Sequence, residues 1–172
     1  MKRILLPLAL FACFYGESLF VDLFSTASLF KDRLVIPHFL LIALTLMGIY
    51  FFRNTAIMYA AAFGLIFDIY YTEIIGVYLF LFPISVYIAS KMIKLLQVNV
   101  LTAALIVIIN ISLVEWLIYG LNILLFNVPV RMMEFLENRL LPSLALNLIF
   151  YFIIFVPYTR WLQHLHKKLS SE

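Results

Sequence analysis

Residues 60–83 read AAAFGLIFDIYYTEIIGVYLFLFP, an apolar run that is interrupted by the carboxylate of Asp68. The run is longer than the apolar part of a soluble helix and has the length that a bilayer requires. A carboxylate inside a membrane span is costly unless it is protonated, hydrated, hydrogen-bonded or matched by another protein. The stretch therefore predicts a membrane-embedded chain in which Asp68 has a defined role.

The composition of the whole chain supports this prediction. Of its 172 residues, 66% are hydrophobic and 12% are charged, and the mean hydropathy is +1.10. A soluble domain has about half apolar and about a quarter charged residues. The net charge of +3 comes from short basic clusters between apolar runs, which does not indicate a nucleic-acid interface. Cys13 is the lone cysteine, so an intramolecular disulfide and a thiolate metal site are excluded.

Counting apolar runs of about 20 residues predicts an all-α membrane bundle with six spans in a single domain over residues 1–172. The basic start of the chain resembles a secretory signal, but its apolar run is long enough for a retained first span. Pro37 suits the first turn of the second span, and the tight connection at Arg53 and Asn54 pairs the second and third spans as a hairpin. The predicted spans are 4–24, 35–52, 55–72, 74–96, 99–126 and 139–161.

The distribution of Lys and Arg predicts that both termini are cytoplasmic, because cytoplasmic loops collect basic residues. In that orientation the inside holds eight of them and the outside four. The longest outer connection, residues 126–139, places Met133, Leu136 and Leu140 at helical spacing. It is expected either to lie flat on the membrane or to be a solvated linker. The eight inner residues are Lys2, Arg3, Arg53, Lys91, Lys94, Arg160, Lys167 and Lys168, and the four outer ones are Lys31, Arg33, Arg131 and Arg139.

Three carboxylates are predicted at a similar depth in the outer half of the bilayer. Glu17, Asp68 and Glu115 lie roughly 20–24 Å from the inner ends of their spans. The interiors of the predicted spans contain no Lys or Arg that could neutralise them. Neighbouring helices, water or another polypeptide must therefore satisfy these groups.

Two interpretations of Asp68 follow from its neighbours. Tyr70 and Tyr71 are typical of an interfacial aromatic belt, in which the carboxylate would reach headgroup water. Alternatively, a narrow face of small residues ends at Asp68 and receives a partner helix or an internal neighbour, with the carboxylate fixing the register. The residues of this small-residue face recur every four positions, and they are Ala56, Ala60, Gly64 and Asp68.

The fifth and sixth spans also carry polar residues at helical spacing. These residues are expected to face inward, where they would form either a hydrogen-bond network that holds the bundle together or a pocket or partner groove. The polar positions are Ser112, Glu115, Tyr119 and Asn122 in the fifth span and Ser143, Asn147 and Tyr151 in the sixth.

The sequence gives no positive sign of an enzyme. His38, His164 and His166 lie at span ends or in the tail, none near another likely ligand at depth, so no metal site and no cofactor are expected. No nucleophile elbow or phosphate-binding glycine loop is present. Intramembrane carboxylates can catalyse proteolysis or lipid chemistry, which leaves an enzyme as a minor alternative.

Residues 36–91 resemble the MreD family of the bacterial rod-shape, or elongation, machinery. The resemblance rests on the proline that opens the second span, the Gly-Leu-x-x-Asp step from Gly64 to Asp68, Gly76 at the start of the next span, and Tyr87 late in it. The six-span count and the length of 172 residues fit the family across the whole chain.

The resemblance implies a non-catalytic scaffold in the bacterial cytoplasmic membrane. Such a scaffold would bind the single-span protein MreC and help couple MreB filaments to peptidoglycan synthesis by RodA and its transpeptidase partner. The family is also similar in fold to the substrate-binding subunits of energy-coupling-factor transporters. A transport subunit with an outward-facing polar pocket is therefore the alternative function, and the small-residue face would then serve the coupling subunit.

Overall fold

The computed structural model describes residues 5–24, 33–72, 74–126 and 131–170. Within these ranges every regular element is helical, which confirms the all-α prediction. Three of the basic residues that were used to predict the orientation lie outside these ranges, namely Lys2, Arg3 and Lys31. Residues 127–130 of the long connection also lie outside them. The elements are α1 (Leu5–Phe24), α2 (Phe39–Tyr50), α3 (Arg53–Tyr71), α4 (Val77–Leu95), α5 (Val100–Phe126), α6 (Met132–Phe135), the π-helix η3 (Leu136–Leu140) and α7 (Leu141–Ser170).

Four helical stretches of the described chain are long and apolar enough to cross a membrane. They are Leu5–Phe24, Val77–Leu95, Val100–Leu125 and Met132–Ser170. The predicted third span corresponds to α3, which has 19 residues including Arg53 and Asp68 and is not among these four stretches. The remaining predicted span, at residues 35–52, differs most from the structure because its helix, α2, has only 12 residues.

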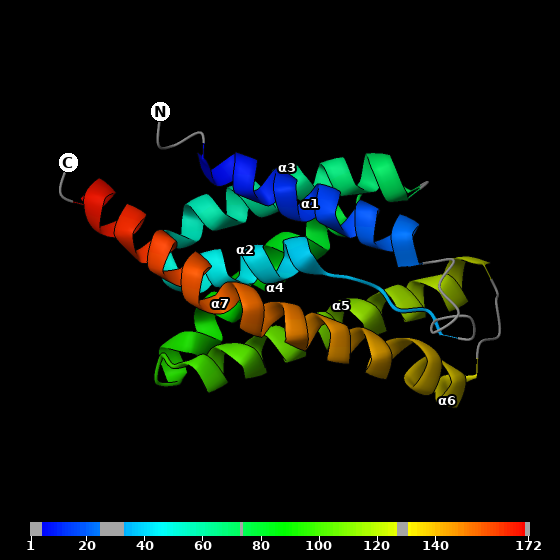
Figure 1. Cartoon of the computed structure of the whole chain (residues 1–172). Coiled ribbons are helices and arrows are strands. Elements are labelled where there is room, and N and C mark those ends of the chain that lie inside the picture. The colour runs from blue at the N-terminus through cyan, green and yellow to red at the C-terminus, as the bar shows by residue number, and fades with distance from the viewer. Residues whose placement is uncertain (1–4, 25–32, 73, 127–130, 171–172) are drawn as a thin grey trace.

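Helix α2 lies in the middle of the bundle (Figure 1). It contacts α1, α3, α4, α5 and α7, and all residues from Phe39 to Gly48 are buried. A helix that is apolar on every side is expected in such an interior position. Its 12 residues extend about 18 Å, which is too short for a bilayer core of about 30 Å.

The chain before α2 is extended rather than helical. Residues 33–38 form no helix, and α2 begins at Phe39 with His38 as its N-cap. The prediction that Pro37 lies in the first turn of the helix is therefore wrong. The physical reason is that the backbone of this segment bonds to side chains of α7 instead of to its own next turn.

The described part of the predicted outer connection is helical. Residues Met132–Ser170 run continuously through α6, η3 and α7, with Phe135 and Leu140 buried. Residues 132–140 are therefore neither a solvated linker nor a separate helix lying on the membrane. Met132 and Met133 stay exposed, but the buried Phe135 and Leu140 tie this stretch to the bundle, and it continues into the last helix, which reaches Ser170 rather than residue 161.

Candidate functional site

Asp68 accepts hydrogen bonds from the first turn of α4. Its Oδ2 atom lies 2.8 Å from the backbone nitrogen of Gly76 and 3.0 Å from that of Leu79, and its Oδ1 atom lies 2.8 Å from the backbone nitrogen of Tyr78. The first N–H groups of a helix have no partner within the helix and carry partial positive charge. The carboxylate of α3 therefore supplies the cap that the sequence next to α4 does not provide.

The small-residue face positions this cap. Ala56, Ala60 and Asp68 are fully buried, and the neighbour across this face is α4 of the same chain. A Cβ atom on Gly64 would lie 2.4 Å from the carbonyl oxygen of Tyr78, closer than real Cβ atoms come to other heavy atoms. The interpretation of Asp68 as a carboxylate reaching headgroup water is wrong, because helix contact on this face removes it from solvent.

Glu17 acts in the same way on α2. Its Oε1 atom lies 2.8 Å from the backbone nitrogen of Leu40, in the first turn of α2. The side chain is only 4% exposed. Two of the three predicted carboxylates thus lie at helix N-termini, where a negative charge is favoured by the helix dipole.

Glu115 is held between two basic side chains. One carboxylate oxygen lies 2.7 Å from Nε2 of His38 and the other lies 2.7 Å from Nε of Arg139. The expectation that no resident cation meets these carboxylates is wrong, since Arg139 of η3 reaches into the bundle. The expectation that His38 lies near no other likely ligand at depth is also wrong, because α5 brings the carboxylate of Glu115 against it.

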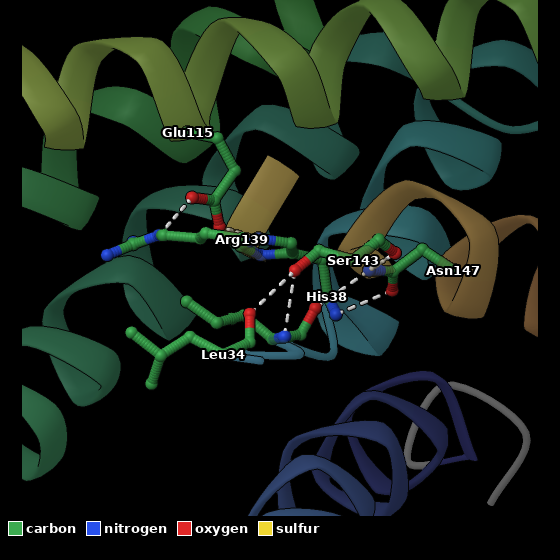
Figure 2. A network of polar contacts seen from close by, with 7 residues as sticks. Leu34, His38, Glu115, Arg139, Ser143 and Asn147 are labelled. Carbon is green, nitrogen blue, oxygen red and sulfur yellow. Dashed lines mark hydrogen bonds and ion pairs between the residues drawn. The ribbon is translucent and has the colours of Figure 1, made fainter. Parts of the chain in front are cut away.

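Side chains of α7 complete the polar contacts of the extended segment (Figure 2). The amide of Asn147 accepts from the backbone nitrogen of His38 at 2.7 Å and donates to the carbonyl oxygen of Ile36 at 2.9 Å. Ser143 accepts from the backbone nitrogen of Ile36 at 2.9 Å and donates to the carbonyl of Leu34 at 3.4 Å. Extended backbone is tolerated in a membrane protein when neighbouring groups satisfy it in this way.

The other predicted polar positions point in different directions. Ser112 is half-buried, and the ring of Tyr119 stacks on Phe135 with centroids 4.3 Å apart. Asn122 lines a cavity of about 250 Å³ together with Tyr71 and Tyr78. The predicted face of α5 therefore divides between the core contact of Glu115 and a separate cavity.

Tyr78 lies among the buried charges. Its backbone nitrogen bonds to Asp68 at the start of α4, while Glu17 and Glu115 bond to Leu40 and His38 at the start of α2, so the topology brings the three carboxylates to one end of the bundle. We call this the carboxylate end. Most of their oxygen atoms are committed to hydrogen bonds, and Oε2 of Glu17 is the carboxylate oxygen that has no partner within the described residues. The arrangement is suited to fixing backbone geometry rather than to proton transfer.

Sequence reasoning missed His38 and Arg139 as members of this cluster. It treated both as residues at the ends of spans, and their partner Glu115 is 77 residues from His38 and 24 from Arg139. Pro37 was an available signal, since a proline disfavours helical backbone at the residue before it. Within the described residues, no group of three metal-ligating side chains gathers.

Comparison with known proteins identifies similar chains. The family model for the rod shape-determining protein MreD matches residues 2–165. The rod shape-determining protein MreD of Bacillus subtilis strain 168 is 31% identical over 172 residues, covering 100% of both chains. No solved structure matches, so the expected similarity in fold to transporter subunits has no support from this comparison.

Proposed function

Because the chain belongs to the MreD family of rod shape-determining proteins, we propose that it is a non-catalytic membrane scaffold of the elongation complex. In this role it binds an MreC-like single-span protein and helps couple MreB filaments to peptidoglycan synthesis by RodA and a transpeptidase. The observation that carries the proposal is the match to a rod shape-determining protein along the whole chain.

The use of the buried polar groups supports a scaffold rather than an enzyme. Asp68 and Glu17 cap helices, and Glu115 is paired with His38 and Arg139. A catalytic acid or base must be able to reach a substrate, whereas these groups are bonded to the protein and buried. Their hydrogen bonds and ion pairs stabilise one defined arrangement of helices. A protein that positions its partners requires such a fixed arrangement.

The partner helix would meet a surface other than the small-residue face. Ala56 and Ala60 are fully buried and Gly64 lies against the backbone of α4, so this face is occupied within the chain. Exposed apolar side chains remain on α1 and α7, where either lipid or a partner helix can pack. The cavity beside Asn122 is small, at about 250 Å³, and is lined mostly by apolar side chains of the described chain, so it gives the transport alternative little specific support.

We place the protein in the bacterial cytoplasmic membrane with both termini in the cytoplasm. The start of α3, at Arg53, and the end of α4, which holds Lys91 and Lys94, lie toward the same end of the bundle as the C-terminal part of α7 (Figure 1). The carboxylate end is opposite. Because Lys and Arg prefer the cytoplasmic side, basic residues at one end and carboxylates at the other favour cytoplasmic termini.

Replacement of the chromosomal gene in Bacillus subtilis tests the proposal. Cells that carry this chain in place of their own MreD are expected to stay rod-shaped and to retain MreC in detergent extracts pulled down through this chain. As a control, an empty vector should give rounded cells. Rounded cells despite full-length chain in the membrane, together with no retained MreC, would overturn the scaffold proposal.

A further inference from the structure

The end of the bundle opposite the carboxylates contains a cavity that the scaffold role does not use. Its volume is about 690 Å³, and it lies where the turn between α2 and α3 meets the last turns of α4. Arg53 and Lys94 line it from these two elements, and Asn54 and Thr55 add polar groups. The volume is within the range of about 300–1,000 Å³ that is usual for sites of small ligands.

The basic groups around this cavity have no acidic partner in the described chain. The described ion pairs are those of Glu115, and none involves Arg53, Lys91 or Lys94. The described Asp and Glu residues all lie in the helix halves nearer the carboxylate end, and they are Glu17, Asp22, Asp68, Glu115, Glu134 and Glu137. The positive charge of the cavity is therefore uncompensated by described carboxylates.

Two of these basic side chains lie against the same aromatic ring. The guanidinium of Arg53 lies 5.9 Å from the ring centroid of Tyr87, and the ammonium of Lys91 lies 5.5 Å from the same centroid. Lys91 and Lys94 are three residues apart on α4, a spacing at which like charges repel. A bound anion would offset this repulsion.

The backbone adds a further attraction for an anion. Arg53, Asn54 and Thr55 form the first turn of α3, and no side chain caps that turn. The neighbouring helix α5 differs, because Asn99 accepts from the backbone nitrogen of Thr102 at 2.8 Å. The first turn of α3 thus offers unsatisfied N–H groups on the wall of the same cavity.

The remaining walls are mostly apolar, apart from Ser90, and indicate the kind of anion. Phe52, Ile93 and Val98 line the cavity, and Leu95, the residue after Lys94 in the chain, is 87% exposed. A free phosphate ion would gain nothing from these side chains, whereas a lipid would place acyl carbons against them. A phosphodiester headgroup could meet Arg53 and Lys94 at the same time.

We propose that this cavity binds the headgroup of an anionic phospholipid, with Arg53 and Lys94 holding the phosphodiester and the apolar walls accepting the first acyl carbons. The site depends on the geometry of α3 and α4 and not on the scaffold role or on the orientation in the membrane. Its failure would leave the proposed function unaffected.

The test is native mass spectrometry of the full-length protein in an uncharged detergent, titrated with phosphatidylglycerol or with phosphatidylcholine of the same acyl chains. Phosphatidylglycerol is expected to bind at lower concentration. The Arg53→Gln, Lys94→Gln double variant is expected to weaken it by at least about tenfold, since each basic residue near an anionic lipid surface contributes severalfold to binding. Asn54→Trp fills the cavity without changing the charge, and it is expected to weaken the binding of phosphatidylglycerol by a similar factor.

The matched control is Arg160→Gln with Lys167→Gln, which removes the same charge from α7, outside the cavity. Equal weakening by this control would overturn the site in favour of a diffuse surface attraction. Unchanged binding in the double variant would also overturn it. Displacement of the lipid by equimolar inorganic phosphate or polyglutamate would assign the cavity to a free anion or an acidic peptide instead.

A single variant covers the case in which the double variant does not fold. Lys94 is exposed, and Lys94→Gln alone is expected to weaken the binding of phosphatidylglycerol severalfold.

Discussion

The carboxylate of Asp68 accepts a hydrogen bond of 2.8 Å from the backbone nitrogen of Gly76, eight residues further along the chain. Gly76 has φ of +119°, a backbone conformation that side chains disfavour, and it lies directly before α4. The pair therefore determines how the chain turns from α3 into α4. The stability of that turn, and of the packing next to it, should depend on Asp68 and Gly64.

Replacing Asp68 by Leu should destabilise the protein by about 2–4 kcal/mol, because three N–H groups at the start of α4 lose their acceptor. Asp68→Asn keeps one acceptor oxygen and should have a smaller effect. SDS-titrated unfolding in mixed micelles measures both. The control Glu134→Gln changes an exposed carboxylate and should have little effect. Equal stability of Asp68→Leu and the control would contradict the capping role.

Gly64→Ala should be destabilising although alanine is the better helix former. Its Cβ atom would lie 2.4 Å from the carbonyl oxygen of Tyr78, so α4 would have to move away from α3. Gly120→Ala is the matched control, because the added methyl group there would meet no atom within 4 Å apart from its chain neighbours and its own helix backbone. That change should be neutral or stabilising by up to about 1 kcal/mol. Comparing the thermal unfolding midpoints of the two variants in detergent checks the prediction, which a stable Gly64→Ala would refute.

Replacing either Glu115 or Arg139 alone should lower the free energy of unfolding by about 3–5 kcal/mol, because the remaining charge loses its partner. Arg139 is 22% exposed and Glu115 is fully buried, so Arg139→Leu should be the more costly change. The double variant Glu115→Leu, Arg139→Leu should cost less than the sum of the two single changes. A double-mutant cycle on unfolding free energies measures this coupling, and strict additivity would contradict it.

Asn147→Leu should loosen the extended segment before α2. It removes the acceptor for the backbone N–H of His38 and the donor to the carbonyl of Ile36. Hydrogen exchange followed by mass spectrometry should show faster exchange in peptides covering residues 34–40. Asn122→Leu removes an amide that lines the separate cavity and should leave this exchange unchanged. Identical exchange in the two variants would be evidence against the role of α7 in holding the segment.

The proposed orientation predicts one pattern of labelling from outside intact cells. With native Cys13 changed to Ala, a cysteine introduced at Glu134 should react with a membrane-impermeant maleimide, and one introduced at Ser170 should react only after permeabilisation. Both positions are exposed, so access rather than burial decides the result. Labelling at Ser170 in intact cells would reverse the orientation.

Patterns within single helices were predictable from the sequence. The spacing of small residues from Ala56 to Asp68 gave a close-packed face, and the apolar runs gave the helices, because each pattern repeats with the period of one helix. The same reasoning placed α2 too early, at residue 35 rather than at Phe39. A length count does not distinguish a full span from a short helix preceded by extended chain.

Composition and run length were enough to predict a helical membrane protein, because the cost of exposing apolar side chains to water depends on them alone. The partners of the buried carboxylates, by contrast, follow from how the helices pack. Glu115 meets His38 across 77 residues, and the segment before α2 meets Asn147 across 109. Such partners are selected by which helices pack side by side, and helical periodicity carries no information about that choice.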